Sequence, residues 1–256
     1  MTEHPGFGAL LARLLERRGF GVRAVADRAG VAASEVDAVL AGGTPSEGLL
    51  RRLAPALTFR AVDLFVLAGV AVPEDLAPLD AAARHSVASI VAGAVGLPAA
   101  GRSDLLRLIR SMPQEERGSR FSPKPPMPLT GGPGSWVVRM LQYRNLNWMG
   151  MARTLAFVTP TCLSAATYGV IGSGRKELSP RLVTDFAAVL GLDARELAGL
   201  AGVVLHEMPA PPSPEAVDAA ELLWEARRLS AAQARHVSEV AWSLLADSRG
   251  ASGYRS

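Results

Sequence analysis

The sequence predicts an all-α protein. Ala, Leu and Arg dominate the composition, whereas strand-forming residues are sparse. Apolar residues recur at the three-to-four-residue spacing of an amphipathic helix. Glycine or a capping residue follows almost every such segment, as expected where short helices end. With 256 residues, the chain is long enough for two domains with ordinary cores.

A run of short helices is predicted before residue 70. The first has leucines at helical spacing and ends at Gly19. The fourth opens at a capping box formed by Thr44 and Glu47, with Pro45 at the first helical position. The expected helical ranges are 10–18, 22–29, 34–40, 45–57 and 60–68.

The same order of helices returns in the second half. Ser135 is expected to cap the first of them, and the second begins near Trp148. The third is predicted over 159–168, with Thr159 as the N-cap and Pro160 at the first helical position. Ser179 and Pro180 open the fourth, and Asp193 with Glu196 caps the fifth.

The two sets of helices match residue by residue in places. Leu49-Leu50 corresponds to Leu182-Val183, and Leu67–Val70 corresponds to Leu200–Val203. A period of about 130 residues is too long for a solenoid, so a duplicated domain is predicted. Each copy is followed by an apolar helical pair. The predicted parts are a first domain (1–78), its helical pair (79–112), a linker (113–134), a second domain (135–208), its pair (209–247) and a disordered tail (248–256).

The predicted linker is rich in Pro, Ser, Lys and Gly and contains little to bury. Its 22 residues would reach roughly 25 Å as a flexible coil and about 65 Å if proline extends them. Either length would allow the two halves to lie one DNA turn apart, about 34 Å.

The stretch Thr159–Lys176 is the one that the rest of the chain is expected to hold in place. Its helix presents hydroxyls and small groups, which can hydrogen-bond or touch methyl groups at base edges. Glycines between 169 and 174 are expected to end the helix and to allow positive φ. Arg175 and Lys176 then supply two cations, so the stretch is typical of a base-reading helix beside a phosphate-binding loop.

The net charge is only slightly positive, but its distribution is uneven. Between Arg139 and Arg181, six basic residues stand against one acidic residue, Glu177. Such a basic field suits phosphate contacts, and it is equally typical of a solvated helical face in an arginine-rich protein.

A common pattern of residues occupies the start of each half. In the first half it comprises Val25-Ala26, Gly30-Val31, Ser34, Val36 and Gly42, and in the second Ala152, Val158–Thr161, Leu163-Ser164 and Gly169. With this pattern, both halves resemble the phage repressor and Cro type of helix-turn-helix domain, also called the xenobiotic-response-element type. The second half differs in having Phe157 where the turn usually has glycine, and one further residue before the turn.

The resemblance implies two lambda-repressor-like five-helix domains. In that family the second and third helices form the motif, and the third helix enters the major groove. The residues that it places at base edges are Thr159, Pro160, Thr161, Cys162, Ser164 and Ala165. Those expected to neutralise phosphates are Arg144, Arg153, Arg175, Lys176 and Arg181. The implied partner is double-stranded DNA, and the implied function is sequence-specific transcriptional regulation.

The corresponding helix of the first half is acidic. It carries Glu35 and Asp37 and no cation, so repulsion from phosphates should dominate there. The first domain is therefore expected to have lost DNA binding and to serve dimerisation or partner docking. A competing hypothesis for the whole chain is an interaction scaffold, antitoxin-like or sigma-factor-binding, built on repressor-like folds.

Several residues have a simpler interpretation beside the functional one. Cys162 suits a small semi-exposed filler better than a redox sensor. Trp136 and Trp148 are expected to cover the core rather than stack on bases. Tyr168 could contact phosphate or close its helix. The last helical pair is expected to pack internally and, secondarily, to offer a homodimer face.

Other classes of protein have little support. No nucleophile with a positioned histidine, carboxylate pair or cofactor fingerprint points to an enzyme. Four scattered histidines and a single cysteine predict neither a metal site nor an internal disulfide. The N-terminus lacks the features of a signal peptide, and the longest apolar segment, Val87–Ala100, is too short to cross a bilayer. A cytoplasmic protein without cofactors is expected.

Overall fold

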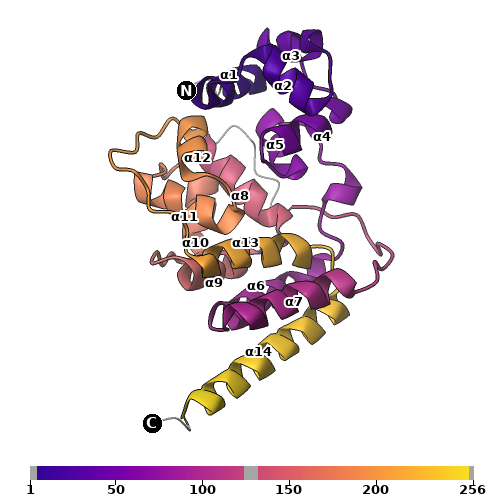
Figure 1. The fold of residues 1–256 in the computed structure, drawn as a ribbon, viewed down its shortest axis with the longest axis vertical. Coiled ribbons are helices and arrows are strands. Elements are labelled where there is room, and N and C mark those ends of the chain that lie inside the picture. Colours follow the sequence, from indigo (N-terminus) through magenta and orange to yellow (C-terminus); the bar gives the residue numbers. More distant parts are fainter. Residues whose placement is uncertain (1–4, 124–131, 254–256) are drawn as a thin grey trace.

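The computed structural model describes residues 5–123 and 132–253, and all regular secondary structure within them is helical (Figure 1), which confirms the all-α prediction. The first half contains α1 (Phe7–Arg18), α2 (Val22–Ala29), α3 (Ala33–Leu40), α4 (Glu47–Ala56), α5 (Ala61–Ala68), the 3-10 turns η1 (Glu74–Leu76) and η2 (Ala81–Ala83), α6 (Arg84–Val95) and α7 (Ala99–Ser111). The second half contains α8 (Pro133–Tyr143), α9 (Trp148–Val158), α10 (Ala165–Gly172), α11 (Pro180–Leu190), α12 (Ala194–Ala201), α13 (Pro214–Ala226) and α14 (Ala231–Gly253).

Helices α1–α5 and α8–α12 form two units with the same packing. In the first unit α1 contacts α3 and α5, α2 contacts α3 and α4, and α4 contacts α5. In the second unit α8 contacts α10 and α12, α9 contacts α10 and α11, and α11 contacts α12. All of these pairs recur in both units, as a duplication of one five-helix arrangement would produce, and the second unit has in addition a contact between α8 and α11.

Two glycines occupy equivalent places in these units. A Cβ added at Gly8 would lie 2.2 Å from the carbonyl oxygen of Val39, and one at Gly134 would lie 2.4 Å from that of Ile171. In each unit the second residue of the first helix thus touches the backbone of the third helix, an approach that no side chain permits.

Most helix ends follow the predicted local signals. Gly19, Gly30 and Gly191 end α1, α2 and α11 in the left-handed conformation, as expected. The side chains of Ser179 and Asp193 cap α11 and α12 by accepting backbone N–H groups.

Two predicted caps were wrong. The N-cap of α4 is Ser46, whose side chain accepts from the N–H of Leu49, so Thr44 and Pro45 lie before the helix. Ser135 lies inside the first turn of α8, where its hydroxyl donates to the carbonyl of Gly132.

The two units contact each other reciprocally. α1 packs against α12, and α8 packs against α5. Arg18, at the end of α1, donates to Glu196, the third residue of α12. Arg144, directly after α8, donates to Asp63, the third residue of α5. This exchange of equivalent contacts is the pattern of an isologous interface between two copies, here within one chain.

Each of these arginines also holds its own unit together. Arg18 donates to the carbonyl of Leu57 at 2.7 Å, and Arg144 donates to that of Leu190 at 3.1 Å. Both carbonyls lie at the C-terminal end of the unit's fourth helix. Each guanidinium therefore satisfies a helix-end carbonyl while pairing with an acid of the other unit.

The helical pairs do not each pack on the copy that precedes them. α6 and α7 pack with α13 and α14 into a common layer (Figure 1), and α6 also packs against α9 of the second unit. α6 is buried along most of its length, and it approaches α14 so closely that a Cβ at Gly93 would lie 3.1 Å from that of Ala241. The layer therefore packs against the second unit, through contacts of α6 with α9 and of α13 with α11.

Within the described residues the two halves are in direct contact and do not lie apart as the length of the linker would allow. The halves are joined by the contacts between the units, and residues 113–123 lie against the body of the protein. Arg117 donates to the carbonyls of Glu74 and Ala77, and the ring of Phe121 packs 5.5 Å from that of Tyr143. Linker residues 124–131 lie outside the described residues.

The C-terminal helix is longer than predicted. α14 continues to Gly253, so residues 248–253 are helical rather than a disordered tail, and residues 254–256 lie outside the described part of the chain. Within residues 5–123 and 132–253, no helix combines the length and the apolar character needed to cross a bilayer.

Candidate nucleic-acid interface

The predicted recognition helix begins five residues later than the sequence indicated, with its N-cap at Ser164 instead of Thr159. Thr159 is the residue after α9, and Pro160 lies in the turn, so the prediction that they open a helix was wrong. The hydroxyl of Thr159 donates to the carbonyl of Leu155 and accepts from the N–H of Thr161. It therefore ends α9, and the helix that follows has Ser164 at its N-cap position.

The turn between α9 and α10 is held by a cation from α11. Arg181 donates from Nε to the hydroxyl of Thr161 at 3.0 Å and from a terminal nitrogen to the carbonyl of Pro160 at 3.1 Å. The equivalent turn of the first unit, between Ala29 and Ala33, is shorter. The extra residue that distinguishes the second half in sequence lies before this turn, within α9, and so does not account for the difference.

α9 and α10 are locked together by Tyr168. Its hydroxyl donates to the carbonyl of Met151 at 3.1 Å, and its ring meets the edge of Phe186 from α11. Tyr168 is fully buried, and burial raises the pKa of its phenol. A phosphate contact by this residue is thereby excluded, and its role is to close the motif.

The predicted base-facing residues are placed unequally. Pro160, Cys162 and Ser164 are exposed, Thr159 and Ala165 are half-buried, and Thr161 is buried. Because the hydroxyl of Thr161 is engaged by Arg181, the prediction that Thr161 faces a base was wrong. Ser164 remains on the surface at the start of α10, where its hydroxyl lies 2.9 Å from that of Thr167.

Sequence reasoning missed one exposed residue in the first turn of α10. Ala166 is exposed, one position beyond the predicted set. Its omission follows from the misplaced helix start, because the first helical turn was assigned to Thr159–Cys162 instead of Ala165–Thr167. The N-cap preference for serine was the signal that could have located it.

The basic residues around α10 are mostly accessible. Arg175, Lys176 and Arg181 are exposed, and Arg153 on α9 is half-buried. Arg175 donates to the hydroxyl of Ser173, which orients its guanidinium beside the C-terminal end of α10. A positive φ of 72° at Gly174 makes this reversal of the chain possible.

Two further predictions about this region were wrong. Arg144 is 1 % exposed and paired with Asp63, so it cannot meet a phosphate. Gly169 lies inside α10, Gly172 is its last residue, and only Gly174 of the three has a positive φ. Both errors concern residues whose surroundings come from distant parts of the chain.

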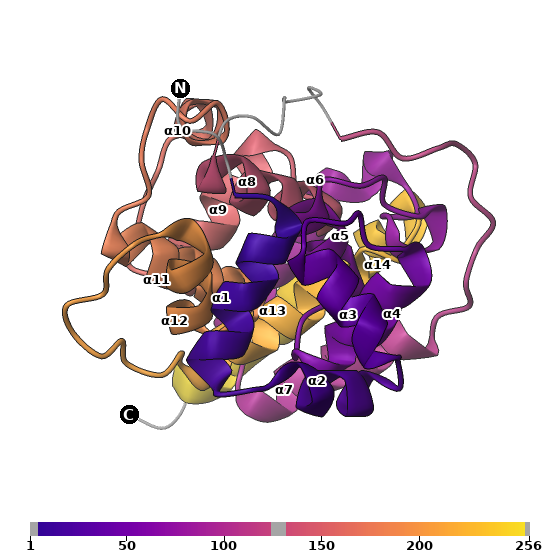
Figure 2. The same cartoon turned by 90° about the horizontal axis from the view of Figure 1, so that it is seen from above.

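The equivalent surface of the first unit has the opposite charge. On α3, Asp37 is exposed, whereas the carboxylate of Glu35 accepts from the backbone N–H of Ala32 and so caps its own helix. Figures 1 and 2 both show α3 and α10 well apart. The exposed ends of the two helices are therefore separate surfaces.

No family model matches the chain, and no curated protein or solved structure shows significant similarity to it. The class that the fold defines is accordingly an all-helical protein built from two five-helix units and a helical layer. Among the residues described, no group of three or more His, Cys, Asp or Glu side chains is placed to hold a metal ion.

Proposed function

We propose that this protein binds double-stranded DNA in a sequence-specific manner and regulates transcription. In this proposal α9 and α10 form a helix-turn-helix, and the first turn of α10 enters the major groove. The proposal rests chiefly on one observation: Ser164 and Ala166 are exposed at the start of α10, and exposed cations lie near both ends of this helix. Arg181 lies beside the turn that precedes it, and Arg175 and Lys176 lie in the loop that follows it.

The exposed groups at this end of α10 suit base edges. Cys162, Ser164 and Ala166 are small, and none carries a charge that would lose its hydration in the groove. A serine hydroxyl can donate or accept, and alanine can contact the methyl group of thymine. Ser164, Ala165 and Ala166 thus replace the predicted Thr159–Thr161 as the residues proposed to read sequence.

The cations beside the helix suit the phosphate backbone. Arg175 and Lys176 lie in the loop after α10, and Arg181 lies in the first turn of α11. Arg181 has 65 % of its side chain exposed while it supports the turn, so it can approach a phosphate without leaving Pro160 and Thr161. Glu177 opposes these charges at one exposed position.

A salt titration tests this assignment. In the full-length protein, replacing Arg175 and Lys176 by Ala should weaken binding to all DNA sequences alike and reduce the slope of log K against log salt by about 2. Arg107→Ala is a matched control, because Arg107 is an exposed arginine on α7, which packs against α6, α13 and α14. Unchanged binding in the double variant would contradict the proposal.

Sequence selection from random DNA tests the reading residues separately. Ser164→Ala and Ala166→Val should change the selected sequence, while the salt slope remains that of the wild type. Identical selected sequences for wild type and both variants would show that α10 does not read bases.

A second candidate is an interaction scaffold that binds another protein through the first unit. The exposed carboxylate of Asp37, and the lack of any cation on α3, favour a basic partner there. A scaffold of this kind would show no steep dependence of DNA binding on salt, so the same titration distinguishes the two functions.

A further inference from the structure

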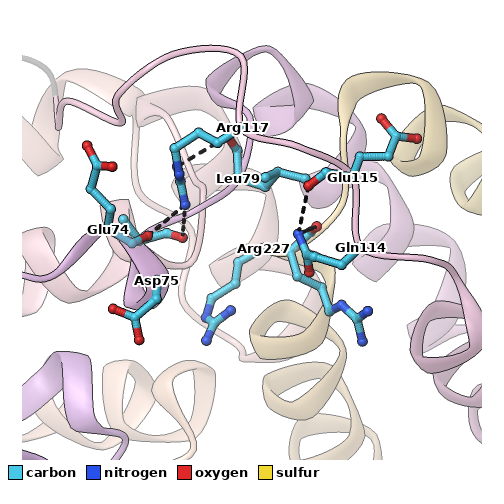
Figure 3. Close-up of a pocket in the computed structure, with 9 residues that line it drawn as sticks. Glu74, Asp75, Leu79, Gln114, Glu115, Arg117 and Arg227 are labelled. Carbon is cyan, nitrogen blue, oxygen red and sulfur yellow. Dashed lines mark hydrogen bonds between the residues drawn. The ribbon is translucent and has the colours of Figure 1, made fainter.

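A pocket of about 380 Å³ lies between three segments that are distant in sequence (Figure 3). Its walls come from η1 and the residues after it, from residues 114–117, and from the end of α13. This volume is in the range of small-molecule sites, which are of the order of 300–1,000 Å³. The pocket lies apart from α10 and has no part in the proposed DNA contacts.

Hydrogen bonds hold the walls of the pocket in place. The N–H of Leu79 donates to the carbonyl of Arg227 at 2.9 Å. Arg117 donates to carbonyls of the segment 74–79, and Gln114 donates to the carbonyl of Arg228. The three segments are therefore tied together around the cavity, which is a preformed site rather than a gap between mobile loops.

Arg227 is the unusual residue of the lining. Its guanidinium stacks on the ring of Trp224, with the central carbon 3.6 Å from the ring centroid. Its Nε is buried and has no hydrogen-bond partner, and no carboxylate pairs with its guanidinium among the residues described. Arg227 is half-buried, and a cation partly withdrawn from water is costly unless it meets an anion.

The charges around Arg227 make its unpaired positive charge more costly. Burial and, next, the nearby cation Arg144 lower the pKa of Arg227 to about 10; Glu225 opposes this effect, and Arg60 and Arg228 add to it to a lesser extent. Arg144 is already paired with Asp63, and Arg60 with Glu221. The surroundings of Arg227 are thus positive, and its positive charge is not matched by a partner.

The acidic residues of the lining are occupied elsewhere. Asp75 is bound by Arg51 through two hydrogen bonds of 2.8 Å, and Glu74 lies 3.4 Å from Arg120. Figure 3 shows the carboxylates of Glu74 and Glu115 directed away from Arg227. Asp75 attracts Arg227 electrostatically, but no hydrogen bond or ion pair joins any of these carboxylates to its guanidinium among the residues described.

We infer that the pocket binds the carboxylate or phosphate group of a small molecule, with Arg227 as its anchor. A guanidinium forms two parallel hydrogen bonds to either oxyanion, and the stacking on Trp224 holds its plane in a fixed orientation. The residues that frame the bound group are Arg228 and Gln114. This site is independent of the proposed DNA binding.

Thermal unfolding of the full-length protein tests the inference with two probes, inorganic phosphate and succinate, each balanced with sodium chloride to constant ionic strength. One or both should raise Tm by about 5 °C or more at a hundredfold excess over Kd. Response to phosphate alone identifies a phosphate site, and response to succinate alone identifies a carboxylate site.

Variants separate specific binding from general salt effects. Arg227→Met should lose the anion-dependent rise and, without anions, should be at least as stable as the wild type, because it removes an unpaired half-buried charge. Arg227→Lys keeps the charge and should bind about tenfold more weakly. Arg107→Met should respond as the wild type does. An equal rise in Arg227→Met, or no rise in the wild type with either probe, would overturn the inference.

Discussion

The buried ion pair between Arg144 and Asp63 provides a direct test of how the two units are joined. Their side chains are 1 % and 0 % exposed, and the pair connects the end of α8 to α5. Removal of one partner from such a pair leaves an uncompensated buried charge and costs roughly 3–5 kcal/mol. Asp63→Leu should therefore lower the free energy of unfolding by about 4 kcal/mol, and Tm by about 8–16 °C.

A double variant separates the charge from the packing. In Asp63→Leu with Arg144→Met both charges are gone, so most of the stability should return. The carbonyl of Leu190 loses its donor in this variant, which leaves a residual cost of about 1 kcal/mol.

The equivalent pair, which joins α1 of the first unit to α12 of the second, serves as the matched control. Arg18 and Glu196 have the same positions in their helices, but their side chains are 14 % and 15 % exposed, so water partly solvates them. Glu196→Leu should cost about 1.5 kcal/mol. Urea unfolding followed by far-UV circular dichroism measures all three variants and the wild type. The reasoning fails if Asp63→Leu is no more damaging than Glu196→Leu, or if the double variant is as unstable as the single one.

Two further predictions concern the second unit and can be measured in the same unfolding experiments. Gly134→Ala should destabilise the protein by several kcal/mol, because its Cβ would lie 2.4 Å from the carbonyl oxygen of Ile171. Gly169→Ala, whose Cβ meets nothing within 4 Å, should instead stabilise the protein by about 0.5–1 kcal/mol. Equal effects of the two substitutions would show that the close contact between α8 and the backbone of α10 is not needed. Tyr168→Phe should cost about 1 kcal/mol through the lost hydrogen bond to Met151. Because burial raises the pKa of Tyr168, the folded state retains the phenolic proton, so wild-type stability is retained below about pH 10 and falls above it, more steeply than that of Tyr168→Phe. Parallel pH profiles would contradict this role.

The sequence alone was sufficient for the fold class and for most helix boundaries. Gly19, Gly30 and Gly191 end helices because only glycine enters the left-handed conformation without steric cost. Ser179 and Asp193 start helices because their oxygens accept the N–H groups that a first turn leaves unpaired. These interactions join residues that are close in the chain, so the amino-acid sequence is enough to predict them.

The candidate site was predicted only in part. Arg175, Lys176 and Ser164 are exposed as expected, since polar residues in a glycine-rich loop have little to bury them. The helix start was misplaced because Thr159 and Pro160 are as good an N-terminal signal as Ser164. The choice between them depends on Arg181, twenty residues along the chain, which holds the turn in an extended form.

Only the tertiary structure decided which charges reach the surface. Arg144 and Arg175 have the same chemistry, but one is sealed between α5 and α8 by Asp63 and the other is open to solvent. The tertiary structure also decided that α6 and α7 pack with α13 and α14, and that the Nε of Arg227 has no hydrogen-bond partner. Burial and ion pairing depend on contacts between residues far apart in the chain, and no local pattern specifies which of several equivalent partners will meet.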